Sequence, residues 1–90
     1  MCSSGYYRIL EADLEKFVST LKGTIAADCE SSARNYIDHN EFGLAFEDIC
    51  FYFRDVKKKI PSDCRELFRE LAERMGIDRK YWIPLIENDA

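Results

Sequence analysis

The sequence predicts an all-α protein, a compact antiparallel bundle of four helices with a short fifth helix near the C-terminal end. Apolar residues recur at helical spacing along most of the chain, and no segment sustains the alternation of a strand. The predicted helices are joined by only about two to five residues, a length that makes neighbouring helices antiparallel. Ninety residues offer room for one core, so residues 1–90 are expected to form a single domain.

The first two helices are expected at about residues 5–22 and 25–38, where apolar side chains share one face of each helix. On the first helix this face carries Tyr6, Ile9, Leu10, Leu14, Phe17 and Leu21. Gly23 and Thr24 then break the helical pattern. On the second helix the apolar face carries Ile25, Cys29, Ala33, Tyr36 and Ile37.

The third helix, at about residues 41–57, has one broad apolar face. Asn40 is its expected N-cap, and the carboxylate of Glu41 in the first turn would interact favourably with the helix dipole. Three lysines, Lys57 to Lys59, follow at the other end, where positive charge offsets exposed carbonyl groups. The apolar face comprises Phe42, Ala45, Phe46, Ile49, Cys50, Phe53 and Val56.

Pro61 and Ser62 are expected to end the third helix and begin the fourth, because a residue before proline disfavours helical dihedrals and serine is a good N-cap. Gly76 is expected to end the fourth helix in a Schellman motif, with Ile77 supplying the apolar contact. A short fifth helix capped by Asp78 should then reach about residue 82. The apolar face of the fourth helix comprises Cys64, Leu67, Phe68, Leu71, Ala72 and Met75.

Composition excludes several classes of partner. The chain carries 13 basic and 17 acidic residues, for a formal net charge of −4. Because a phosphate backbone is held by clustered lysine and arginine, we expect no nucleic-acid partner. No apolar run is long enough for a membrane span and no secretory leader is recognisable, so we expect a cytoplasmic protein without membrane contact. The four glycines are isolated rather than grouped in a phosphate-binding loop, and no cofactor is expected.

The four cysteines, Cys2, Cys29, Cys50 and Cys64, form no Cys-x-x-Cys pair, so the sequence offers no zinc or dithiol motif. Their even number would allow two disulfides. Three of them fall on predicted apolar helix faces, however, where a free thiol packs as a small hydrophobic group. We therefore expect reduced cysteines, as is usual in the cytoplasm.

The polar corner between the second and third helices holds the only histidine, His39. His39 could serve as a general base oriented by Asp38 or Glu41. However, neighbouring positions on a helix point in different directions, and no nucleophile motif accompanies these residues. The three side chains also supply too few ligands for a structural metal site. We favour a histidine at a polar helix end, with no catalytic residue and no metal site.

The outer side of the third helix is the other candidate site. Opposite its apolar face lie charged residues, with Leu44 and Phe51 among them. An aromatic side chain surrounded by carboxylates would suit a partner with a basic rim, because the ring adds affinity and the charges steer association. Two interpretations stay open: an exposed binding face, or a helix buried on nearly all sides. The candidate binding residues are Asp38, Glu41, Glu47, Asp48, Phe51 and Asp55.

Residues 36–50 resemble the helix-corner motif of MafI-type immunity proteins, in which Tyr-Ile-Asp-His, a turn residue, an acidic residue, an aromatic and Gly-Leu-Ala follow one another. Here the pattern from Tyr-Ile-Asp-His to Gly-Leu-Ala occupies residues 36–45, and the resemblance continues to Cys50. Further matches are Ile60-Pro61-Ser62, residues 71–78 and the pair at 81–82, so the resemblance extends over about residues 7–82. This chain has Asn40 where glycine is expected, and residues 51–59 depart more from the pattern.

The resemblance implies a small, non-catalytic helical protein that binds one copy of a cognate toxin domain and neutralises it inside the cell. The toxins implied are the C-terminal domains of polymorphic or contact-dependent systems, with EndoU-like ribonucleases first among them. Direct occlusion by an acidic surface fits a nuclease, whose substrate groove is basic. In this family context Tyr36, Gly43 and Leu44 would fix the corner. The alternative is a small helical adaptor or regulatory module without a toxin partner.

Overall fold

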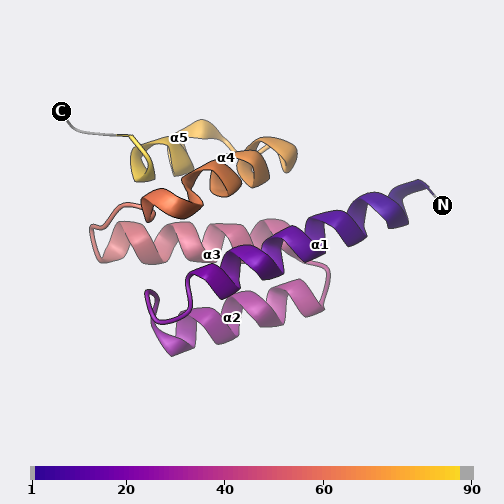
Figure 1. Cartoon of the computed structure of the whole chain (residues 1–90), viewed down its shortest axis with the longest axis horizontal. Helices are drawn as coiled ribbons and strands as arrows, with labels where there is room; N and C mark the ends of the chain where they lie inside the picture. The colour runs from indigo at the N-terminus through magenta and orange to yellow at the C-terminus, as the bar shows by residue number, and fades with distance from the viewer. Residues whose placement is uncertain (1, 88–90) are drawn as a thin grey trace.

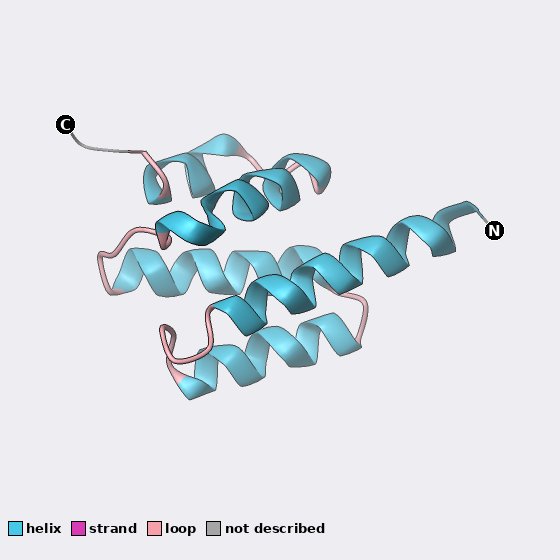
Figure 2. Cartoon of the chain, in the orientation of Figure 1, coloured by secondary structure: helices cyan, strands magenta, loops and turns pink. Residues whose placement is uncertain are grey.

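Helices account for most of the chain, as Figures 1 and 2 show. The computed structural model describes the backbone of residues 2–87 and the side chains from residue 8 to residue 87. Within that range there are five α-helices, two short 3₁₀ turns and no strand, which confirms the all-α prediction. The elements are α1 (Cys2–Thr20), α2 (Ala27–Asp38), α3 (Phe42–Asp55), η1 (Ser62–Cys64), α4 (Arg65–Arg74), α5 (Arg79–Trp82) and η2 (Ile83–Leu85).

Successive long helices run antiparallel, and α3 lies at the centre of the arrangement (Figure 1). The most extensive helix pair is the hairpin of α2 and α3, which are joined by three residues. The first helix crosses this hairpin and packs against α2, α3 and α4. The C-terminal elements α5 and η2 return to α3 and pack against it. Most sides of α3 are therefore covered by other elements.

An aromatic cluster centred on Phe68 joins four of the helices. Phe68 of α4 is fully buried, and its ring stacks on Phe46 of α3 with 4.7 Å between ring centroids. Phe17 of α1 lies 5.7 Å away in a tilted arrangement. Trp82 of α5 meets the same ring edge-on at 6.4 Å, while its indole N–H donates to the carbonyl of Ile77 at 3.0 Å. Such offset and edge-on pairs add to the gain from burial, and here they bring distant parts of the chain together.

Two arginines reinforce the packing of α1 at its polar edges. Arg34 of α2 donates to Glu15 of α1 at 3.0 Å and to Glu30 on its own helix at 3.1 Å. Arg74 at the end of α4 donates to Asp13 of α1 at 2.6 Å. These half-exposed ion pairs each contribute little free energy but orient the helices that they join.

Three helices end in Schellman motifs, in which a residue at positive φ reverses the chain. Asn40, Lys57 and Gly76 have φ values of 59°, 58° and 66° and follow α2, α3 and α4. After α4 the amide of Gly76 donates to Glu73 and that of Ile77 donates to Ala72, which confirms the predicted ending. The same pair of bonds follows α2 and α3. Lys57 adopts this conformation without the steric freedom of glycine.

The predicted N-caps are partly wrong. Asn40 was expected to cap α3, but its positive φ makes it part of the ending of α2, and Glu41 becomes the N-cap residue rather than a first-turn residue. Glu41 makes no side-chain capping bond. Ser62 is not the N-cap of α4, because the chain enters α4 through a 3₁₀ turn that Ser62 begins, and Cys64 takes the N-cap position. Asp78 does cap α5, since its carboxylate accepts from the amide of Lys80 at 3.1 Å.

Two predicted core residues are exposed. Ile9 is 61% exposed because the N-terminal part of α1 extends beyond the other helices (Figure 1). Val56 is 37% exposed because α3 ends at Asp55, which leaves Val56 just outside the helix. The predicted position of Tyr6 falls outside the described side chains.

Gly43 has open space around the position of a Cβ, and Leu44 is exposed, so neither residue fixes the corner by close packing.

Replacing Phe68 with alanine should remove about 3–5 kcal/mol from the free energy of unfolding, because its ring fills the centre of the aromatic cluster. For a chain of this size that is a large part of about 5–13 kcal/mol in total. Urea unfolding followed by circular dichroism measures the change. The matched control is Phe51→Ala at an exposed ring, which should cost about 0.5 kcal/mol or less. A cost below about 1 kcal/mol for Phe68→Ala would contradict the central role of this ring.

Candidate functional site

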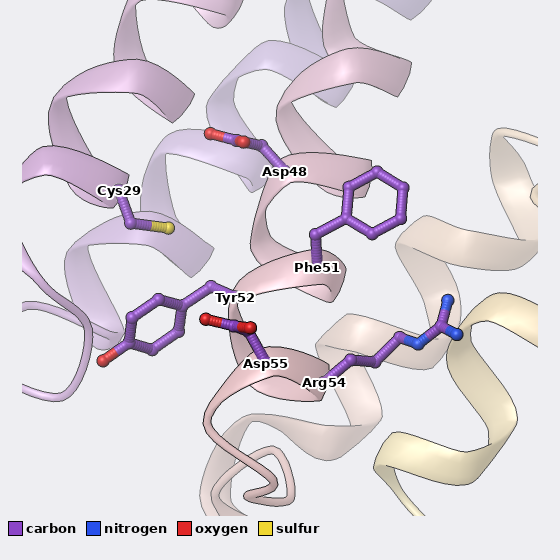
Figure 3. A pocket seen from close by; sticks show the side chains of 6 residues that line it. All are labelled: Cys29, Asp48, Phe51, Tyr52, Arg54 and Asp55. Carbon is purple, nitrogen blue, oxygen red and sulfur yellow. The ribbon is translucent and has the colours of Figure 1, made fainter.

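The outer face of α3 is exposed, which excludes a helix buried on nearly all sides, whereas binding by this face stays a prediction. Phe51 is 55% exposed and Leu44 is 46% exposed, although six other residues of the same helix are buried. The helix is therefore not enclosed on all sides. A large aromatic side chain stands on its outer face next to the carboxylates of Asp48 and Asp55 (Figure 3).

An open depression of about 600 Å³ lies on this face, between α2 and α3. It is lined by Cys29, Asp48, Phe51, Tyr52, Arg54 and Asp55. Cys29 belongs to α2 and its sulfur points towards α3, whereas the other five residues belong to α3 (Figure 3). We call this feature the α2–α3 depression.

The charges around the α2–α3 depression are separated rather than paired. Asp48 and Asp55 lie on the side of α3 nearer α2, whereas Arg54 extends to the opposite side, towards the C-terminal helices (Figure 3). No ion pair between described residues joins Arg54 to either carboxylate. Asp48 and Asp55 are seven positions apart, or about 10 Å along the helix axis. The depression therefore offers two separate negative groups along one wall.

Phe51 also borders a second hollow, of about 120 Å³, between α3 and α5. This α3–α5 depression is lined by Glu47, Cys50, Phe51, Arg54 and Tyr81. Phe51 and Arg54 line both hollows, so the Phe51 ring projects between them. A projecting ring with a hollow on either side makes this face uneven, and a docking partner with a complementary shape could fit against it.

Beyond Arg54 the surface becomes basic. Arg54 lines a third hollow, of about 220 Å³, together with the three lysines at 57–59 and residues of η2. Lys59 donates to the carbonyl of Pro84 at 2.6 Å, and the amide of Ile60 donates to Leu85 at 2.9 Å. The lysine segment thus helps to attach the C-terminal turn to the bundle, in addition to following the end of α3.

The structure brings four of the six candidate binding residues together. Asp48, Phe51 and Asp55 line the α2–α3 depression, and Glu47 lines the α3–α5 depression. Asp38 and Glu41 are exposed at the corner and line neither hollow. Glu41 precedes α3, which puts it about 20 Å from Asp55 along the helix axis.

His39 is the C-cap residue of α2 and is exposed. Its Nδ1 atom lies 2.8 Å from the carbonyl oxygen of Asn35, a contact within its own helix. No side-chain hydrogen bond or ion pair between described residues connects His39 to Asp38 or Glu41. Among the side chains that the structure describes, no group of three or more histidine, cysteine, aspartate or glutamate residues is arranged to hold a metal ion.

The described cysteines are free thiols, as expected: Cys50 and Cys64 are buried, and Cys29 is half-buried. Burial raises the pKa of Cys29 to about 11, with a smaller contribution from the negative charge of Asp48. Burial likewise raises the pKa of Cys50 to about 12, assisted by Glu47. These thiols stay protonated at neutral pH and have little nucleophilic character.

Five residues of the two hollows were not among the predicted binding residues: Cys29, Cys50, Tyr52, Arg54 and Tyr81. A signal for Cys29 does exist in the sequence. In an antiparallel helical hairpin that turns at Asn40, residues at equal distances from the turn face each other, which pairs position 29 with position 51. No comparable signal places Tyr81, because its position depends on how the C-terminal segment returns to α3.

Comparisons with protein-family models, with curated proteins and with solved structures find no match to this chain. The resemblance to MafI-type immunity proteins therefore depends on the motif at residues 36–50 and the shorter matches after it, and it stays a prediction. Among the residues that the structure describes, no helix has both the length and the apolar character needed to cross a membrane.

Cys29 and Cys50 should react with iodoacetamide far more slowly in the folded protein than in urea. A pKa of about 11 for Cys29, against an ordinary value of 9.0, reduces its thiolate fraction about 100-fold near pH 8. Peptide mapping by mass spectrometry measures both rates, with Cys2→Ser removing the cysteine whose side chain is not described. Alkylation of Cys29 at the unfolded rate would contradict its burial.

The same raised pKa values predict how stability depends on pH. Because folding favours the neutral thiols, their contribution is complete below about pH 9 and is lost as the pH rises towards 11–12. Urea midpoints across this range should fall less steeply for Cys50→Ala than for the parent chain, since alanine has no thiol to ionise.

Proposed function

We propose that this protein is an immunity protein, which binds a cognate toxin domain one to one and neutralises it by direct occlusion. The favoured target is a nuclease, with an EndoU-like ribonuclease first, encountered inside the cell that makes the immunity protein. The binding surface is the outer face of α3, where Phe51 is the anchor and the carboxylates of Glu47, Asp48 and Asp55 surround it. No catalytic step is assigned to the chain.

The observation that carries this proposal is the exposed Phe51 ring projecting between two hollows. Aromatic residues that fill a pocket of the partner supply much of the affinity in protein interfaces. In a chain of 90 residues most large apolar side chains are needed for the core, and all the other phenylalanines are buried. An exposed phenylalanine beside open hollows is therefore well suited to contact a partner.

The charge of the same face supports a basic partner. Glu47, Asp48 and Asp55 border the hollows around Phe51, and the chain as a whole carries a net charge of −4. A ribonuclease must present a basic groove to bind its substrate, and an acidic face would be steered to that groove. Occlusion needs only that the complex excludes RNA, so no chemistry is required of the immunity protein.

The proposal predicts a stable one-to-one complex with the toxin domain encoded immediately upstream of this chain's own gene, and rescue of growth when both are expressed. Light scattering after size exclusion measures the stoichiometry, and colony counts measure the rescue. Phe68→Ala is the control for stability, because it should weaken binding and rescue only as far as it lowers the folded fraction. A folded wild-type chain that neither binds nor rescues would end the immunity assignment, and binding to a different cellular protein would favour the adaptor alternative.

Charge and anchor should affect different rate constants. Reversing Glu47, Asp48 and Asp55 to lysine should slow association by about tenfold or more at low salt, because the charges steer the encounter. Phe51→Ala should mainly speed dissociation, by about tenfold or more, since it removes the anchor from its pocket. Surface plasmon resonance at about 0.05 and 0.5 M salt separates the two effects.

The matched control reverses three acidic residues elsewhere on the surface: Asp63, Glu66 and Glu73, all exposed and none lining either hollow. It makes the same change in net charge, so a similar loss of association rate would assign steering to overall charge rather than to this face. Unchanged rate constants for both the α3 triple variant and Phe51→Ala would place the interface elsewhere.

A further inference from the structure

Asp48 differs from the other described carboxylates in how it is solvated. Its Oδ2 atom has less than 1 Å² of exposed surface and no hydrogen-bond partner, and it is the only buried side-chain nitrogen or oxygen in this condition among the described residues. The side chain as a whole is half-buried and lines the α2–α3 depression. One oxygen of the carboxylate is therefore desolvated while the group still borders an open hollow.

Such an arrangement is unfavourable in the isolated protein. A carboxylate oxygen that leaves water without gaining a donor loses hydration that nothing replaces. Elsewhere the fold avoids this cost, since Asp13, Glu15 and Glu30 all receive arginine donors at distances between 2.6 and 3.1 Å. Asp48 lacks such a donor, and the nearby Arg54 extends away from it (Figure 3).

Oδ2 itself is too buried for an outside donor to reach, so a cation has to approach the carboxylate from the side that borders the hollow. The remaining features of the depression favour arginine for this role. Tyr52 and Phe51 supply aromatic surface beside Asp48, and a guanidinium group stacks on such surface and is less strongly hydrated than an ammonium. The volume of about 600 Å³ admits a long side chain. Cys29 faces Asp48 across the depression as a protonated thiol, which does not compete for the cation.

We propose that Asp48 receives an arginine side chain of the partner, with the guanidinium at the carboxylate and the arginine stem against Tyr52. This assignment rests on the proposed function in that the partner is the toxin domain. The assignment adds one requirement for the toxin surface: an arginine side chain must lie beside the toxin pocket that receives Phe51. Because Oδ2 is already desolvated before binding, part of the usual desolvation cost of a buried ion pair is met within the free protein.

The isolated chain allows a first test that does not need the toxin. The probe is N-acetyl-arginine amide, titrated into ¹⁵N-labelled protein while the backbone amide shifts are followed by NMR. Saturable shifts are expected at residues 48, 52 and 55, with a Kd of the order of millimolar. N-acetyl-lysine amide should bind at least about threefold more weakly, because an ammonium does not stack in the same way. Equal binding of the two probes would overturn the choice of arginine.

Asp48→Asn keeps the side-chain shape and removes the charge, so it should abolish saturable binding of the arginine probe. The matched control is Asp63→Asn, the same exchange at an exposed aspartate that lines neither hollow, which should leave the titration unchanged. If Asp48→Asn fails to fold, the location of the shifts in the wild-type chain decides instead. Shifts confined to residues outside the α2–α3 depression would overturn the proposal.

The second test uses the complex with the toxin domain. Asp48→Asn should raise its Kd by about tenfold or more, whereas Asp63→Asn should change it less than twofold. A complex that forms with the same Kd in both variants, together with no saturation by the arginine probe, would end the Asp48 assignment and leave the immunity function standing. If the probe saturates the site but the protein forms no complex with the toxin domain, the proposed immunity function is contradicted and the arginine site is still supported.

Discussion

The packing of Phe68 against rings from three other helices is the interaction on which the rest of the structure depends. Phe17, Phe46 and Trp82 come from α1, α3 and α5, and all three rings pack against Phe68 of α4. Because α1, α5 and η2 gather on α3 while α2 pairs with it, the core is complete without a contribution from the outer face of α3. The cluster thus leaves that face free.

The helices could be predicted from the sequence because burial of one face imposes a period on the apolar residues. Helix ends were harder, because each depends on the backbone angle of a single residue. Asn40 can either cap a following helix or reverse the chain at positive φ, and the sequence pattern is the same in both cases. Lys57 shows the limit of this reasoning, since nothing in its side chain marks it for a positive φ.

The candidate site was predictable in part, for a related reason. Periodicity establishes that Phe51 lies opposite the apolar face of α3, but it does not establish whether another helix covers it. That depends on where the C-terminal segment packs, and the segment reaches α3 at Tyr81 without covering the Phe51 ring. The corner residues Asp38 and Glu41 were grouped with the α3 carboxylates because all of them are acidic. Charge does not indicate how far the corner lies from those carboxylates along the helix.

Two unfavourable features meet on the outer face of α3, an exposed phenylalanine and a carboxylate oxygen without a donor. Two other exposed apolar residues have geometric causes, since Ile9 lies where α1 extends beyond the bundle and Val56 follows the end of α3, whereas Leu44 is exposed within α3 itself. Neither cause applies to Phe51 or Asp48, which lie within a helix that is packed along its length. A small domain has little stability to spare. In the proposed complex, one partner would cover the Phe51 ring and place a cation at the Asp48 carboxylate, so both features would become less unfavourable on binding.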